Sequence, residues 1–236
     1  MARLLSWPVD LRVIRVERLK GPRSINSGIT ESLAGGEQTY SSPFGSISLQ
    51  ITFQPMQDRL ARQHRGWISA LHGGANATRF NYVDADRMEP VEAGIVGEYE
   101  PQRWSNGQPW SNGQWWKPSY PVVPVVSGAA RGGTIVSLDN VFWGHALGMG
   151  DLVGFFPFHF GMYEITEVFE QGRYRIWPPL RKTISVDEFC TLSPTLALRL
   201  VGMDGATVYR EQPAAQGLTA TFIEAFDYDV REYFAD

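Results

Sequence analysis

The nine residues GSISLQITF, at positions 45–53, constrain the fold most, because apolar and polar side chains alternate strictly along them. Successive side chains of a β-strand point to opposite faces of a sheet, so this pattern predicts a strand with one buried face. The apolar face carries Ile47, Leu49, Ile51 and Phe53. Such a strand needs neighbours along both edges and a layer over its apolar face, so the chain must supply further strands and a cover.

Further short segments with strand character recur along the chain. With 24 glycines and 15 prolines among 236 residues, frequent turns separate them. Gln171-Gly172 predicts a hairpin turn between two of them, and residues 202–205 predict a second hairpin. The predicted strands cover residues 11–19, 78–83, 133–138, 150–156, 162–168, 173–177, 195–201, 206–211 and 217–228.

Residues 57–71 form the single predicted helix. Apolar and aromatic side chains recur there at spacings of three and four, which places them on one helical face. Asp58 lies near the predicted N-terminal end, and Gly73 and Gly74 supply a stop. The face consists of Leu60, His64, Trp67, Ile68 and Leu71. The fold class is therefore mainly β, with one flanking α-helix.

The regular pattern fails between positions 84 and 126, where Pro, Gly, Asn and Trp dominate. We interpret the chain as two β units. Residues 1–90 and 191–236 form one discontinuous β domain, because the N-terminal section has too few strands for a sheet and the C-terminal strands need edges to pair with. Residues 91–190 form an inserted loop-rich region and a small β-barrel.

A five-residue phrase, WSNGQ, begins at Trp104 and again at Trp110, and Trp115 and Trp116 follow. Each Asn-Gly pair favours a tight type I′ turn, so the tryptophans flank two bends. These four tryptophans are the candidate interface or ligand-contact residues. They can anchor the loop on its own domain, contact a neighbouring subunit, or stack on a sugar.

No motif for catalysis, cofactor binding or metal binding is present. The four histidines (His64, His72, His145 and His159) lack zinc-ligand spacing. We interpret His64 as a packed core or boundary residue, His159 as an edge or loop residue among aromatics, and Cys190 as a small buried hydrophobe. The glycine-rich residues 127–133 predict a turn. The carboxylates Glu224, Asp227, Asp229, Glu232 and Asp236 predict a solvated acidic face.

The charge pattern argues against several partners. The formal net charge is −4 and no Lys/Arg run exists, so sequence-specific nucleic-acid binding is not expected. No run of about 18 apolar residues predicts a membrane span. The N-terminus lacks the apolar core of a secretion signal, and a single cysteine excludes an internal disulfide. We therefore expect synthesis and assembly in a cytoplasm.

Several segments together resemble the distal tail proteins of siphophages and gene transfer agents, which form the tail-tip ring. These are AGGEQTYSSPFG (34–45), the alternating strand, the helix RLARQHRGWISALHGG, GDLVGFFPFHFGMYEITEV, RIWPPLR (175–181) and the final segment ending FIEAF. The resemblance covers about two thirds of the chain and rests on the order of these segments. Residues 97–120 lie outside it.

The resemblance implies a tail-tube-like β-sandwich with a flanking helix and an inserted SH3- or OB-like barrel. It implies a structural virion protein of a long-tailed bacteriophage, not an enzyme. The protein would form a homohexameric ring at the tail tip, joined to the tail tube, the hub, baseplate or fibre proteins, and the tape measure protein. The alternative is a carbohydrate-binding module that uses the tryptophan loop at 104–116.

Overall fold

The computed structural model describes residues 3–20, 23–26, 39–42, 45–83, 86, 122–139, 147–157, 159–202, 206–207 and 218–226. These residues form many strands, one α-helix and one 3-10 turn, so the predicted mainly β class is confirmed. No helix among them is long and apolar enough to cross a membrane.

The largest sheet draws its strands from the two ends of the chain. Its hydrogen-bonded order is β1-β6-β13-β15-β5-β2, with β14 also paired to β15. The β1–β6 pair is parallel and the other pairs are antiparallel. Its strands are β1 (Leu4–Leu5), β2 (Val13–Lys20), β5 (Ser48–Phe53), β6 (Ala77–Asn81), β13 (Thr195–Leu200), β14 (Ala206–Thr207) and β15 (Thr219–Glu224).

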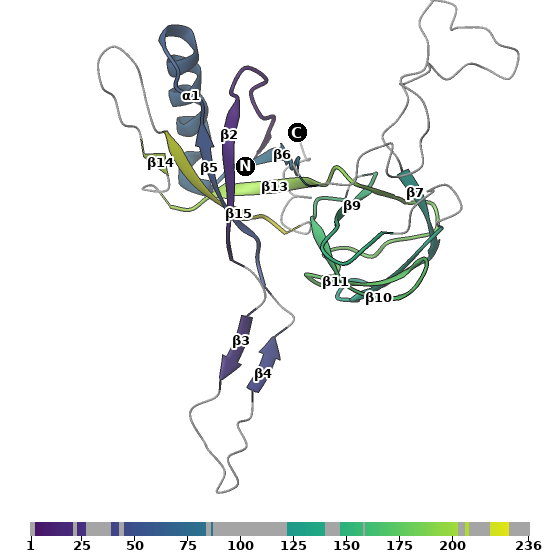
Figure 1. Ribbon diagram of the computed structural model, residues 1–236. Coiled ribbons are helices and arrows are strands. Elements are labelled where there is room, and N and C mark those ends of the chain that lie inside the picture. Colours follow the sequence, from purple (N-terminus) through teal and green to yellow (C-terminus); the bar gives the residue numbers. More distant parts are fainter. Residues whose placement is uncertain are drawn as a thin grey trace, which may run out of the picture.

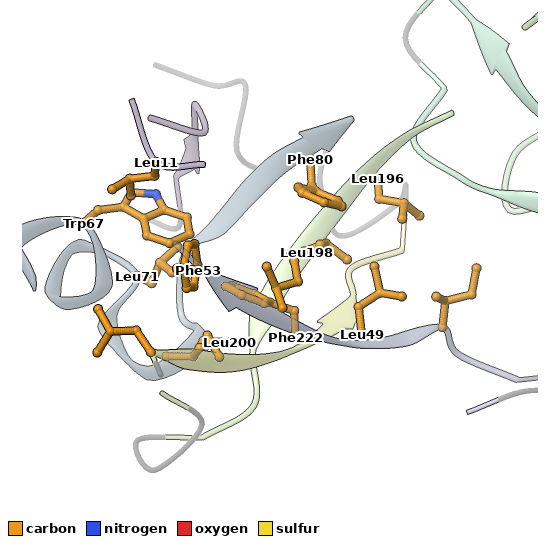
Figure 2. Close-up of a cluster of buried hydrophobic side chains, with 14 of the residues drawn as sticks. Leu11, Leu49, Phe53, Trp67, Leu71, Phe80, Leu196, Leu198, Leu200 and Phe222 are labelled. Atoms are coloured by element: carbon orange, nitrogen blue, oxygen red, sulfur yellow. The ribbon is translucent and has the colours of Figure 1, made fainter. Parts of the chain in front are cut away.

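The predicted alternation in β5 is confirmed, because Leu49, Ile51 and Phe53 are completely or almost completely buried. Opposite Leu49, Phe222 of β15 is also buried. Figure 2 shows Phe53 next to Trp67 of the helix, with Phe222 and Leu49 farther along the same cluster, so the alternating face of the sheet and the helix share one core. Burial of this apolar surface is the main stabilising contribution.

The helix α1 (Asp58–Ala70) lies within one residue of its predicted bounds at each end. Gly73 and Gly74, with φ of 62° and 97°, end it as expected, since glycine adopts positive φ at little cost. A 3-10 turn (His72–Gly74) follows the helix. A Cβ on Gly74 would lie 2.3 Å from the carbonyl oxygen of Leu200, so only glycine lets this turn approach β13.

The predicted hairpin across residues 202–205 is wrong. Residues 222–224 of β15 pair with β13, and residues 219–220 pair with β14. Because β5 pairs along the other side of β15, β13 and β14 must share one side. They therefore run as successive parts of one interrupted strand, and the chain reverses only between β14 and β15.

The middle of the chain forms a closed barrel with the strand order β10-β11-β8-β7-β12-β9. Figure 1 shows it beside the sheet. Its strands are β7 (Val122–Ser127), β8 (Ile135–Leu138), β9 (Leu152–Phe156), β10 (Tyr163–Glu170), β11 (Arg173–Trp177) and β12 (Phe189–Thr191). The predicted hairpin at Gln171-Gly172 is confirmed by the antiparallel β10–β11 pair.

The sequence did not predict β7 or β12. Pro124 interrupts the pattern of β7, but its carbonyl accepts a hydrogen bond from the Asp139 N–H. Val123 and Val125 flank Pro124 and point into the barrel, where both are buried. The assignment of the whole stretch 84–126 to an irregular excursion is therefore wrong at its end.

A second, two-stranded sheet consists of β3 (Arg23–Asn26) and β4 (Thr39–Ser42). These strands continue from β2 and lead back toward β5. In Figure 1 they extend as an arm from the sheet, away from the side that carries α1. The sequence predicted only a polar, glycine-containing segment there.

Candidate functional site

The barrel and the sheet meet at a buried apolar junction. Met162 and Trp177 from the barrel side belong to the same core cluster as Phe222 of the sheet. Phe160 packs in a smaller cluster with Ala197 of β13 and Ala225. Because both clusters contain residues from the two parts, the barrel is held against the sheet by shared buried surface.

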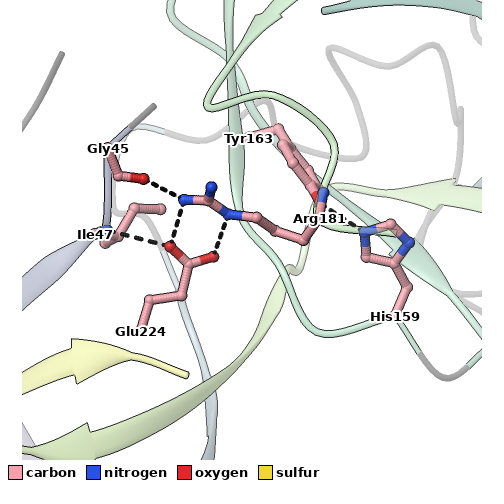
Figure 3. Close-up of polar contacts among 6 residues, drawn as sticks. All are labelled: Gly45, Ile47, His159, Tyr163, Arg181 and Glu224. Carbon is pink, nitrogen blue, oxygen red and sulfur yellow. Dashed lines mark hydrogen bonds and ion pairs between the residues drawn. The ribbon is translucent and has the colours of Figure 1, made fainter. Parts of the chain in front are cut away.

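A bidentate ion pair lies at this junction (Figure 3). The Arg181 Nε donates to Glu224 Oε1 at 3.0 Å, and its Nη2 donates to Oε2 at 2.8 Å. Nη2 also donates to the carbonyl oxygen of Gly45. The side chains are only 8% and 1% exposed, so neither charge is compensated by bulk water. The ring of Phe226 lies 4.7 Å from the guanidinium carbon.

The strand pattern explains why Glu224 is buried. In β15 the even-numbered residues Ala220 and Phe222 point into the core, and Glu224 takes the next inward position. Its carboxylate also accepts the Ile47 N–H of the sheet at 3.2 Å. A charged side chain at an inward position needs a partner, and Arg181 supplies it from just after β11.

The prediction that Glu224 belongs to a solvated acidic face is therefore wrong. Asp227, Asp229, Glu232 and Asp236 lie outside the described residues. The sequence analysis also missed Arg181. The available signal was the alternation of β15, which places one carboxylate among inward apolar side chains.

The polar contacts continue from Arg181 into the barrel. The Arg181 backbone N–H donates to the Tyr163 hydroxyl at 2.9 Å, and this hydroxyl lies 2.6 Å from His159 Nε2. The direction of this second hydrogen bond depends on the tautomer of His159. The Nδ1 atom of His159 lies 3.9 Å from Glu188 Oε2.

This contact refines the prediction for His159. It lies in a loop among Phe155 and Tyr163, as expected, but it is only 3% exposed. Beyond it, Glu188 is 4.0 Å from Lys182 Nζ. The hydrogen bonds thus run from Glu224 of the sheet through Arg181 and Tyr163 to His159, and Glu188 and Lys182 lie beside their end.

A pocket of about 390 Å³ borders the ion pair. Arg131 and Gly132 contribute to it from the turn after β7. This turn lies within the glycine-rich residues 127–133, where one was predicted, although Ser127 still belongs to β7. Arg181 and Phe226 also line this pocket.

The second candidate surface is the β2 edge of the sheet. Among the described residues, β2 pairs with β5 on one side and with no strand on the other. Two of its apolar side chains are exposed, Ile14 at 62% and Leu19 at 48%. An exposed edge strand of eight residues can accept another strand through its backbone groups.

The predicted contact residues Trp104, Trp110, Trp115 and Trp116 lie outside the described residues, as does His145. The interpretation of Cys190 is confirmed: its side chain is fully buried, and burial raises the pKa of the thiol far above its ordinary value. Within the part of the chain that the structure describes, no group of three or more His, Cys, Asp or Glu side chains could hold a metal ion.

His64 is a core residue, as predicted. It is 2% exposed and its ring packs edge-on against Phe53 at 4.8 Å. Burial disfavours the charged ring and lowers the pKa of His64 from 6.5 to about 4.

We expect this burial to make folding stability depend on pH. Between pH 6.5 and about 4 the unfolded chain protonates His64 while the folded chain does not. The free energy of unfolding therefore falls as the pH falls through this range, by up to about 3 kcal/mol at its lower end. Urea titrations of the wild type and His64→Leu across this range measure the effect. Parallel pH profiles for the two proteins would contradict it.

No protein-family model matches the chain, and no curated protein matches it.

Proposed function

We propose that this chain is a structural subunit of a bacteriophage virion, forming the distal tail ring of a long-tailed phage. The sheet with α1 would be the ring-forming, tail-tube-like β-sandwich, and the barrel would be an SH3- or OB-like attachment. The ring, a hexamer in this proposal, would join the tail tube to the hub and the receptor-binding apparatus. It would act by docking, without catalysing a reaction.

The open β2 edge is the observation that carries the proposal. A ring subunit must present complementary surfaces to two neighbours, and an unpaired strand edge supplies directional backbone hydrogen bonds for one of them. A monomeric protein usually blunts such an edge with lysine, proline or a cover. Four of the eight β2 residues are charged, Lys20 among them, yet Ile14 and Leu19 are exposed on the strand as well.

Two further features support a structural role for this subunit. The arm formed by β3 and β4 extends the sheet well beyond its own core, which gives it reach toward a neighbouring subunit (Figure 1). The buried pair Arg181–Glu224 and the shared apolar clusters hold the barrel in a fixed position. A subunit that connects two parts of a shell needs this kind of rigid joint.

The mass of the purified protein tests the proposal. Light scattering should give a discrete ring-sized oligomer, and electron micrographs should show rings. Ile14→Lys should raise the subunit concentration needed for assembly by about tenfold or more, because an added charge near the start of the edge strand opposes strand addition. Val186→Lys is the matched control, since Val186 is similarly exposed at 58% but lies in the barrel portion.

A protein that stays monomeric at high concentration would contradict the proposal. Retention of that monomer on polysaccharide would favour the carbohydrate-binding alternative. Equal loss of assembly in Ile14→Lys and Val186→Lys would show that ring formation does not depend specifically on the β2 edge.

A further inference from the structure

The outer face of α1 carries a row of three arginines, Arg59, Arg62 and Arg65, spaced three residues apart. All three are exposed. Arg59 pairs with Asp10 at 3.0 Å, with both side chains open to solvent. Within the described part of the chain, neither Arg62 nor Arg65 has an ion pair or hydrogen bond. Among the described residues, Arg62 and Arg65 therefore differ from Arg181, which holds two parts of the fold together.

A groove opens at the first turn of the same helix. Its volume is about 500 Å³, and it lies between the loop at residues 9–12 and the start of α1. Arg12 and Arg59 line it together with Asp10, whose carboxylate pairs with Arg59, and Val9 beside them is 95% exposed. Its apolar lining consists of Val9, Leu11, Pro55, Met56 and Leu60.

We infer that the arginine row and the groove together bind an acidic peptide segment of a partner protein. The guanidinium groups match carboxylates in a two-pronged geometry, which favours Glu or Asp side chains over isolated charges. The groove accepts one large apolar side chain of the same segment. The two features are adjacent because Arg59 belongs to both.

The surface fits an acidic protein better than a nucleic acid. Six residues of helix separate Arg59 from Arg65, a distance of about 9 Å, which spans too few phosphates for stable binding in moderate salt. The only Phe, Tyr or Trp of α1 is Trp67, which is buried, so no ring on this helix is free to stack on a base.

Fluorescence anisotropy of the full chain with a labelled probe peptide tests this inference. The probe carries several glutamates around one phenylalanine, and a second probe has glutamine in place of every glutamate. We expect the acidic probe to bind at low salt and the glutamine probe to bind at least about tenfold more weakly. Replacing the phenylalanine of the probe by alanine should weaken binding several-fold, because the groove is then left unfilled.

Two variants with the same charge change identify the surface. Arg62→Gln with Arg65→Gln should weaken binding of the acidic probe about tenfold. Arg173→Gln with Arg175→Gln removes two exposed arginines from the barrel and should leave binding unchanged. Because all four side chains are at the surface, thermal melting should show each variant folded.

Three results would overturn the inference. One is no binding of the acidic probe at about 1 mM peptide in low salt. Another is equal weakening in the two double variants, which would indicate non-specific attraction. The third is tighter binding of a single-stranded oligonucleotide of equal charge. The test does not depend on ring formation, because it can be repeated in the Ile14→Lys background.

Discussion

Arg181→Met is expected to lower the free energy of unfolding by about 3–5 kcal/mol. The substitution leaves the Glu224 carboxylate buried without its cation, and among the described residues the Ile47 N–H is the remaining hydrogen-bond donor to it. The loss should loosen the barrel from the sheet, because Arg181 also donates to Gly45. Urea unfolding measures the first effect, and hydrogen exchange in β15 and β11 measures the second.

A thermodynamic cycle separates this charge penalty from the loss of packing. Adding Glu224→Met to Arg181→Met should recover most of the lost stability, because two apolar side chains then replace a desolvated pair. The matched control is the exposed pair Arg175–Glu167, with side chains 47% and 49% exposed. Arg175→Met should cost less than about 1 kcal/mol. Equal costs for Arg175→Met and Arg181→Met would refute a special role for the junction.

Trp67→Ala is expected to cost about 3–5 kcal/mol, since it opens a large cavity between α1 and the sheet. The Trp67 ring is in edge-on contact with Trp7 at 4.7 Å and lies 6.1 Å from both Phe53 and Phe222. Removing it takes one member from a cluster that links the N-terminal loop, the helix and two central strands. Chemical denaturation monitored by circular dichroism measures the loss.

Trp67→Phe is the matched control. The indole Nε1 of Trp67 is buried and, among the described residues, has no hydrogen-bond partner. Phenylalanine keeps an aromatic ring in the cluster and removes this unsatisfied group. We therefore expect a cost of no more than about 1–2 kcal/mol. A loss as large as that of Trp67→Ala would mean that the shape of the indole, rather than filled volume, stabilises the core.

Regular periodicity made the central elements of the sheet predictable. The alternation in β5 and the spacing of three and four in α1 each define one apolar face, and those faces meet in the structure. Gly73 and Gly74 marked the end of the helix because positive φ is cheap for glycine. Each of these signals is local and depends on neighbouring residues only.

The elements and contacts that escaped prediction depend on distant partners. β7 was not predicted because it contains Pro124. A strand tolerates proline only where no neighbouring strand needs the missing N–H as a hydrogen-bond donor, and the sequence does not reveal those neighbours. β14 was assigned to the wrong neighbour, because the glycines at 202 and 205 marked a nearer turn than the connection to β15. Arg181 and Glu224 are 43 residues apart, and no spacing rule links them.

The polypeptide leaves the sheet after β6 and returns as β13, which is the direct antiparallel neighbour of β6. Asn81 and Thr195 face each other at that point, so their Cα atoms are only about 5 Å apart. The segment between β6 and β13 therefore leaves and re-enters the sheet at one point. In evolution, inserted domains of different size can be exchanged at this point without altering the order of the remaining strands. Glu224 limits such an exchange. A different inserted domain must supply a cation for this buried carboxylate, or Glu224 must be replaced by an uncharged residue.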